Sequence, residues 1–260
     1  MKDCREIWYD AAKKASVTFV DVTGVAQTLA RAHLCGPTAA HYLAKGLAAA
    51  ALLGAETSEA DETVIVQMKC SGPLGGLNVE CTAAGTLRGY TERKILDDFD
   101  GLGKPKDKAA LGDCRVQVTH SVPGRILSQG ISSSLDGYLA GSLQRKATIQ
   151  LEASVTDDVE VLMARGVLVE EMPDGANTGV LGVKLKSLAV AERNVLKQLG
   201  LEKAEKRQTT PLSFACRCSP ERAAATLAAL SAEERAALPP SVDITCHMCG
   251  KTYSVAVPRQ

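Results

Sequence analysis

The segments ACRCSP (215–220) and TCHMCG (245–250) place four cysteines close together near the end of this 260-residue chain. One residue separates the cysteines of the first pair, two separate those of the second, and 27 residues lie between the pairs. Two short-spaced thiol pairs joined by a loop are typical of a tetrahedral zinc site, with each sulfur about 2.3 Å from the metal. Because four sulfurs close the coordination shell, we expect a Zn²⁺ that stabilises structure and does not activate water. The predicted ligands are Cys216, Cys218, Cys246 and Cys249.

The same four thiols favour a second role, in redox sensing. Zinc keeps cysteines as thiolates at neutral pH, and the thiolate is the form that oxidants attack. On spacing alone, an inert zinc site, as in a zinc-stabilised adaptor protein, is the commoner case. A thiol oxidoreductase that uses Cys246 and Cys249 is the best enzymatic alternative. The eleven residues after Cys249 are too few, however, for the strand-to-helix setting that such enzymes need.

Residues 211–260 form the predicted C-terminal module around these cysteines. The module has few large apolar side chains, and an alanine-rich helical segment is predicted at 221–230, between the two pairs. A core of this size rarely folds a chain of about 50 residues unaided. Structural zinc supplies apparent free energies of roughly 10–16 kcal/mol in zinc-finger peptides. We therefore expect the module to lose its fold when the metal is removed.

Residues 176–210 are predicted to be an amphipathic helical linker, which follows the turn-forming segment PDGANTG (173–179). Apolar residues recur at i, i+3, i+7 and i+11 opposite charged residues, a pattern typical of a helix with one buried face. Gly200 can cap this helix, and a polar stretch at 202–210 separates it from the module. The predicted apolar face consists of Leu188, Ala191, Val195 and Leu199.

Residues 1–175 alternate strand-like and helix-like patterns, which predict an N-terminal core domain. Alternating β-branched residues and short glycine-containing turns indicate strands, and Pro37 and Gly54 mark the ends of a long helix. The connections between strands are too short for parallel crossovers, so we expect an α+β fold with a mostly antiparallel sheet packed with helices. The predicted strands are 16–22, 63–70, 77–83, 86–91, 114–120 and 147–155, and the predicted helices are 25–34, 38–53 and 133–143.

Composition disfavours several classes of function. Thirty basic and thirty acidic residues cancel and aromatic residues make up 3% of the chain, so we expect no nucleic-acid partner. No apolar run reaches the roughly 18 residues of a membrane span. The catalytic motifs G-x-S-x-G, H-E-x-x-H and the Walker-type phosphate loop do not occur, so we expect neither an enzyme nor ATP binding.

The N-terminal segment and the cysteine count indicate an intracellular, cytoplasmic protein. The segment MKDCREIWYD is charged and lacks the apolar core of a signal peptide. Nine cysteines are an odd number, which fits a reducing compartment better than a secreted disulfide framework. Outside the four predicted ligands we expect the cysteines to be small core residues or bystanders. These are Cys4, Cys35, Cys70, Cys81 and Cys114.

Three features together resemble the redox-switched heat-shock holdases of the thirty-three-kilodalton chaperonin family. The cysteine spacing is the most specific of them. The segment GPLGGLNVECTAAGTLRGY (72–90) resembles the family's glycine-rich strand pair, which ends in an Arg-Gly-Tyr signature. The segment YLAGSLQRKATI (138–149) resembles a family motif of tyrosine, Ser-Glu-Gln and a strand, except that Leu143 stands where the family usually has glutamate. The linker and tail are also shorter than in typical members.

The resemblance implies an ATP-independent chaperone that is silent while reduced and zinc-bound and active after oxidation. It implies that Cys216 joins Cys218 and that Cys246 joins Cys249. Zinc would then leave, and the module and linker would lose structure. The exposed surface would capture unfolding client proteins, often as the protein forms a homodimer. We expect the linker's apolar face to become a client-binding surface when the module that shields it unfolds.

Overall fold

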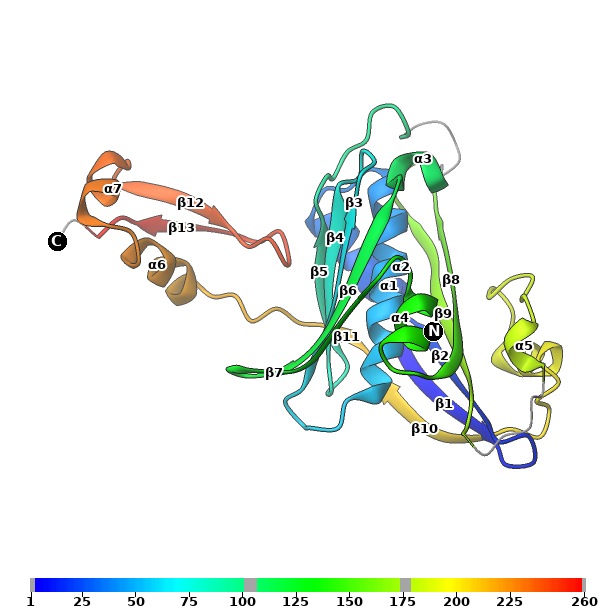
Figure 1. Cartoon of the computed structure of the whole chain (residues 1–260). Coiled ribbons are helices and arrows are strands. Elements are labelled where there is room, and N and C mark those ends of the chain that lie inside the picture. The colour runs from blue at the N-terminus through cyan, green and yellow to red at the C-terminus, as the bar shows by residue number, and fades with distance from the viewer. Residues whose placement is uncertain (1–2, 101–106, 174–178, 259–260) are drawn as a thin grey trace.

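Two β-sheets enclose one long helix in the N-terminal part of the chain (Figure 1). The structure, a computed structural model, describes residues 3–100, 107–173 and 179–258. The first sheet contains five strands, which are β1 (Cys4–Asp10), β2 (Ala15–Asp21), β8 (Lys146–Val155), β9 (Val161–Glu171) and β10 (Glu205–Pro211). The second contains six, which are β3 (Thr63–Cys70), β4 (Gly76–Thr82), β5 (Thr86–Thr91), β6 (Cys114–Val122), β7 (Arg125–Ser132) and β11 (Ser213–Phe214). Their spatial orders are β10-β1-β2-β9-β8 and β11-β5-β4-β3-β6-β7.

The mixed α+β fold and the mostly antiparallel sheets confirm the prediction. Strands β3 and β5 span the predicted residues, and the other predicted strands agree within two residues at each end. Only β11, which pairs with β5, is parallel to its neighbour among the described strands. The first sheet also contains β1, β9 and β10, which the sequence pattern does not predict.

Helix α2 (Pro37–Leu53) is the centre of the main core, and it packs against strands of both sheets. It begins with a proline in its first turn, as predicted, and 15 of its 17 residues are buried. A helix that is apolar all round is stable only when it is enclosed on all sides. Its many alanines let the sheets approach closely, and a Cβ on Gly46 would lie 3.1 Å from Leu77. No helix in the described part of the chain is long and apolar enough to cross a membrane.

Several short helices complete the N-terminal part. They lie at the ends of strands or beside α2. They are α1 (Thr23–Ala32), the 3-10 helix η1 (Gly54–Glu56), α3 (Asp107–Leu111) and α4 (Leu135–Gly141). Leu143, just after α4, packs partly buried against the main core.

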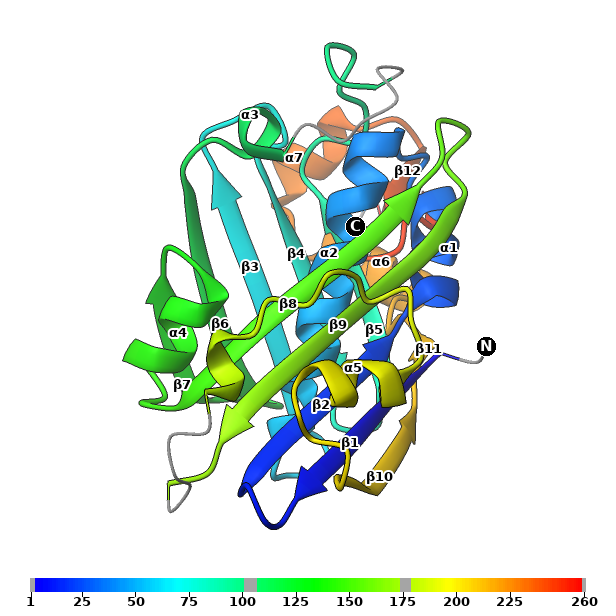
Figure 2. The same cartoon turned by 90° about the vertical axis from the view of Figure 1, so that its right-hand side faces the viewer.

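The linker packs on the outer face of the five-stranded sheet, opposite α2 (Figure 2). The helix predicted from the 188–199 pattern is shorter in the structure, because the described part of the linker contains only the 3-10 helix η2 (Val180–Gly182) and the short helix α5 (Glu192–Gln198). Ala191 is the N-cap of α5 and is exposed, so it does not belong to the buried stripe. Leu188, Val195 and Leu199 are buried in a cluster with Trp8 and Phe19, as the apolar pattern predicts.

Side chains of the underlying sheet explain why the helix does not extend back to Leu188. Gln150 accepts from the Leu185 amide at 3.0 Å and donates to the Val183 carbonyl at 3.0 Å. Arg165 donates to the Leu188 carbonyl at 3.0 Å. These backbone groups are therefore satisfied by the sheet and not by helical hydrogen bonds, which keeps the segment extended.

The polar stretch at 202–210 is largely strand β10, which pairs with β1 at the edge of the five-stranded sheet. The linker therefore follows β9 and ends in β10 of the same sheet. The predicted boundary at residue 175 rests on residues 174–178, which lie outside the described residues. The remaining elements belong to the C-terminal module, and they are α6 (Pro220–Ala228), α7 (Ala232–Ala237), β12 (Ser241–Thr245) and β13 (Thr252–Ala256).

Candidate metal centre

The first cysteine pair lies in the short connection between β11 and α6. Ser219 is the N-cap of α6, and its side chain accepts a hydrogen bond from the Arg222 amide. Pro220 occupies the first turn of the helix, where its missing amide hydrogen costs nothing. The Ser-Pro sequence therefore starts the helix directly after Cys218 and keeps Cys216 and Cys218 together at its N-terminal end.

The second cysteine pair forms the tip of the hairpin between β12 and β13. The amides of Cys249 and Gly250 both donate to the Cys246 carbonyl, at 3.3 Å and 2.8 Å, which closes a tight turn. Gly250 has a φ of +73°, a left-handed conformation that side chains other than glycine rarely adopt. The chain then continues as a strand, which is not the strand-to-helix setting of thioredoxin-like enzymes.

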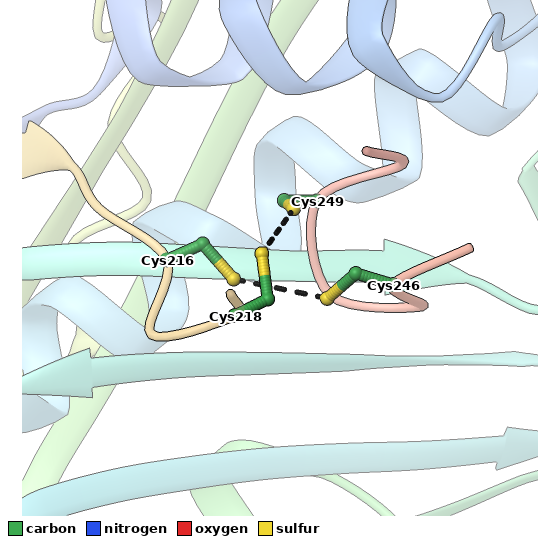
Figure 3. Close-up of side chains that lie close together, drawn as sticks. All are labelled: Cys216, Cys218, Cys246 and Cys249. Carbon is green, nitrogen blue, oxygen red and sulfur yellow. Dashed lines mark hydrogen bonds between the residues drawn. The ribbon is translucent and has the colours of Figure 1, made fainter. Parts of the chain in front are cut away.

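The four sulfur atoms converge to form one site (Figure 3). All four lie within 4.8 Å of one another, and the four residues are partly or fully buried. The Sγ atoms of Cys216 and Cys246 are 3.8 Å apart, and those of Cys218 and Cys249 are 3.4 Å apart. Ligands about 2.3 Å from a tetrahedral centre would lie about 3.8 Å from one another. The cluster could therefore hold a metal ion, and its soft sulfur donors suit zinc.

The cluster has neighbours that stabilise negative charge on sulfur. Arg88 donates to the Cys216 Sγ at 3.7 Å, and the Tyr253 hydroxyl lies 3.2 Å from the Cys218 Sγ. Burial raises the pKa of the Cys216 thiol, but hydrogen bonds from the Cys218 backbone and from Arg88 outweigh burial and lower it to about 7. Burial raises the pKa of Cys246. A substantial fraction of Cys216 is therefore a thiolate near neutral pH.

The Arg-Gly-Tyr sequence of strand β5 forms the seat on which the cysteine cluster rests. Arg88 forms an ion pair with Glu80 at 2.6 Å as well as contacting Cys216. The Gly89 amide donates to the Met248 carbonyl at 3.1 Å. The Tyr90 ring packs edge-to-face on His247, with centroids 5.8 Å apart. Cysteine spacing identifies the cluster but not this seat, which the sequence signals only through the family resemblance of residues 88–90.

Helix α1 forms the other side of this contact. A Cβ on Gly250 would lie 2.3 Å from the Ala32 carbonyl oxygen, so only glycine allows the hairpin tip to approach α1 so closely. The His33 Nε2 atom lies 2.9 Å from the Gly89 carbonyl, which ties the end of α1 to the same strand. The fold of the hairpin tip and its position on the N-terminal part are therefore coupled.

The predicted linker face lies apart from the cysteine cluster, on the outer surface of the five-stranded sheet. Three of its four residues, Leu188, Val195 and Leu199, are at most 6% exposed, and their role in binding clients stays a prediction.

Comparison with known proteins places the chain in a family. The family model described as Hsp33 protein matches residues 8–256, nearly the whole chain. The chain belongs to the Hsp33 family. The match confirms the family resemblance of the cysteine spacing and of residues 72–90 and 138–149.

Hsp33 relatives from several bacteria carry the name 33 kDa chaperonin. One from Thermus thermophilus is 29% identical over 91% of this chain and 79% of its own length. One from Geobacillus kaustophilus is 26% identical over 86% of this chain and 84% of its own length. The crystal structure of the 33 kDa chaperonin from Thermotoga maritima matches with a TM-score of 0.86 at 18% identity, over 98% of this chain and 95% of that one. At that identity the likeness shows that the two proteins share the Hsp33 fold.

Proposed function

We propose that this protein is an ATP-independent chaperone, a holdase, that binds unfolding proteins in the cytoplasm under oxidative stress. Membership of the Hsp33 family and the names of its relatives support a chaperone. The redox part of the proposal rests on one observation, the four converging thiols that could hold Zn²⁺ at the contact between the module and strand β5. The proposal assigns no catalytic residue, no nucleotide and no nucleic acid.

The module's own core is too small to fold it without the metal. Within residues 213–258, only four buried residues form an apolar cluster. These are Ala223, Leu227, Val255 and Val257. At about 0.8 kcal/mol per buried CH₂ group, these side chains supply at most about 9 kcal/mol, far less than the conformational entropy lost when a module of this length is ordered, at about 1–2 kcal/mol per residue; a structural zinc site adds roughly 10–16 kcal/mol. Loss of the metal would therefore unfold the module.

Oxidation converts the metal-binding thiolates into disulfides, which no longer bind zinc. For each disulfide, two thiolates give two electrons to one molecule of peroxide, which takes up two protons and leaves as two water molecules. The family resemblance implies that Cys216 pairs with Cys218 and Cys246 with Cys249. The thiol–thiol hydrogen bonds within the cluster instead join Cys216 to Cys246 and Cys218 to Cys249. Peptide mapping of the oxidised protein under non-reducing conditions distinguishes the two pairings.

Unfolding of the module would uncover strand β5. The Ser213 and Ala215 amides donate to the carbonyls of Gly85 and Leu87, and the Met248 carbonyl accepts from Gly89. Without these partners β5 becomes an open sheet edge, which can pair with an extended chain. Release of the linker would in turn uncover the apolar face around Trp8 and the linker residues that now shield it. Both surfaces suit an unfolding client, and a homodimer of the oxidised protein could share them.

An aggregation assay tests the proposed function. A chemically denatured client protein is diluted into buffer without ATP, and light scattering is recorded with reduced, zinc-loaded protein and with peroxide-treated protein. We expect suppression of aggregation only by the oxidised form, together with release of about one zinc per chain measured with a metal indicator. If the oxidised protein has released all its zinc and light scattering is still the same as with the reduced protein, the proposal of a chaperone activated by oxidation is contradicted. Retention of zinc after oxidation would instead support a zinc-stabilised adaptor.

The only tryptophan reports whether the linker detaches. Trp8 is 4% exposed, and the Arg193 guanidinium of α5 lies 4.5 Å from its ring centroid. We expect Val195→Asp to place an unpaired charge in this cluster, to shift Trp8 emission to longer wavelength and to suppress client aggregation without oxidant. Asn194→Asp, on the exposed side of the same helix, is the matched control and should change neither. A detached linker with no client binding would remove the linker from the proposal.

A further inference from the structure

Two cysteines outside the cluster, Cys70 and Cys114, face each other on neighbouring strands. They are register partners at the end of the antiparallel pair β3 and β6. Their Sγ atoms are 3.2 Å apart, and both residues are only partly buried. Sequence spacing does not indicate this pair, because the two residues lie 44 positions apart in the chain and only the fold brings them together.

The backbone geometry at this position suits a disulfide. The Ser71 amide donates to the Asp113 carbonyl at 2.9 Å, which makes Cys70 and Cys114 a non-hydrogen-bonded pair of the ladder. In such pairs the Cα atoms lie about 4.5 Å apart, within the range of about 4.4–6.8 Å found in disulfides. Bond formation therefore requires rotation of the side chains and no movement of the strands.

The pair lies on the same face of the sheet as residues that line an apolar cavity. Met68 and Val116, two residues along the same face, are also partners and line a cavity of about 230 Å³ beside α2. The glycine-rich turn that follows Cys70 is fixed to α3 by hydrogen bonds from the Gly72 and Leu74 amides. A covalent bond here would secure the end of the sheet on which the cavity and this turn depend.

We propose that Cys70 and Cys114 form a second redox site, at which peroxide introduces a disulfide between β3 and β6. One thiolate attacks the peroxide and becomes a sulfenic acid as the O–O bond breaks and water leaves. The second thiol then attacks the sulfenic sulfur and releases a second water. Overall two thiols and one hydrogen peroxide give one disulfide and two waters. The bond locks the N-terminal part under the same conditions that would unfold the C-terminal module.

The second site should react later than the cysteine cluster. Burial, together with the contact to Cys114, raises the pKa of Cys70 to about 12, whereas bound zinc would keep its cysteine ligands as thiolates. Since the thiolate is the reactive form, little of Cys70 is ready to react at neutral pH. The disulfide in the N-terminal part should therefore form slowly, during prolonged exposure to oxidant.

Peptide mapping tests the proposal on the full, zinc-loaded protein. The protein is treated with hydrogen peroxide, remaining thiols are blocked with N-ethylmaleimide, and non-reducing digests are analysed by mass spectrometry over time. We expect a peptide pair that joins Cys70 to Cys114, lighter by two hydrogens and separated by dithiothreitol. Recovery of both residues as separate N-ethylmaleimide adducts, or as sulfinic acids, after the C-terminal thiols are consumed would overturn the proposal.

Thermal unfolding measures the effect of the bond. A disulfide that closes a loop of this length should raise the Tm of the N-terminal part by roughly 5–15 °C. We therefore expect oxidised wild type to melt higher than oxidised Cys70→Ser/Cys114→Ser by this amount, with no such gap between the reduced proteins. Cys114→Ser alone removes the pair with one change and should behave like the double variant. Equal melting of the oxidised proteins would overturn the stabilising role.

Two controls separate this site from the proposed switch. Cys4→Ser removes another partly buried thiol, one with no sulfur neighbour among the described residues, and should leave both the linked peptide and the Tm gap intact. The Cys114→Ser variant should still release zinc with peroxide, because the four C-terminal cysteines are unchanged. Failure of zinc release in every variant would argue against the proposed function and leave the second redox site standing.

Discussion

The N-terminal part and the C-terminal module differ in what stabilises them. Around α2, buried apolar residues from two sheets form one continuous core. The module has a small apolar cluster, and four thiols converge at its edge, where it meets strand β5. An apolar core is indifferent to oxidants, whereas a thiolate site is not. The same chain thus combines a part that oxidation should leave folded with a part that oxidation should unfold.

Removal of the metal is expected to have the largest effect on this contrast. A zinc chelator added to the reduced protein should unfold the module, since structural zinc sites supply on the order of 10 kcal/mol. Hydrogen exchange followed by mass spectrometry should show loss of protection in residues 220–256 while α2 stays protected. Protection of the module after complete metal removal would mean that its small core suffices.

Truncation of a side chain in the main core is expected to destabilise the N-terminal part and not the module. Leu47 is fully buried in α2, and Leu47→Ala should cost about 2–5 kcal/mol of the free energy of unfolding of the N-terminal part. Urea unfolding followed by Trp8 fluorescence measures this cost. Leu34→Ala, at a position that is 79% exposed, is the control and should change the midpoint little. A similar loss for both variants would show that α2 is not the centre of stability.

Alkaline pH should weaken the N-terminal part through its buried thiols. Burial raises the pKa of Cys35 and of Cys81 to about 11, from a value near 9 in the unfolded chain. Each thiol's contribution is complete below pH 9 and is lost as pH rises towards 11, because only the unfolded chain releases the proton. We expect a loss of about 1–3 kcal/mol per thiol. Urea midpoints between pH 8 and 11 measure it, and Cys35→Ala should flatten the decline.

The contact between the two parts is expected to show the smallest effect. Arg88→Ala removes a half-buried group that contacts both Glu80 and Cys216, and should cost about 1 kcal/mol. Exchange of the Gly89 amide should then accelerate several-fold in the reduced protein. Arg217→Ala removes an exposed partner of the same Glu80 and should have less effect. Equal rates in the two variants would show that Arg88 does not stabilise the contact.

Sequence patterns predict the strands and helices that are formed mainly by the residue types within them. Strand β3 begins with a run of β-branched residues, 63–66, and α2 is bounded by Pro37 and Gly54, so both are evident in the sequence. Strand β9 is interrupted by Gly166, which is needed because a Cβ there would lie 2.8 Å from Leu52. Strand β10 is polar because it is an exposed edge, and only its pairing with β1 makes it a strand.

The candidate site also has a part that the sequence predicts and a part that depends on the fold. Cysteine spacing predicts the cluster, since short-spaced cysteine pairs are typical of structural zinc sites. Neither the seat on β5 nor the Cys70 and Cys114 pair can be derived from spacing, because each depends on strand register between distant segments. The linker helix begins at Glu192 and not at Leu188 for a similar reason, since side chains of β8 and β9 bind the backbone that an earlier start would have used.

The position of β10 sets an order of events. This strand lies between the linker helix and the module in the chain, and its hydrogen bonds to β1 anchor the C-terminal end of the linker. Unfolding that spreads along the chain from the cysteine cluster would therefore disrupt β11 and then β10 before it reaches α5. The length of the ladder between β1 and β10 would then set how far such unfolding spreads before the apolar face around Trp8 is exposed.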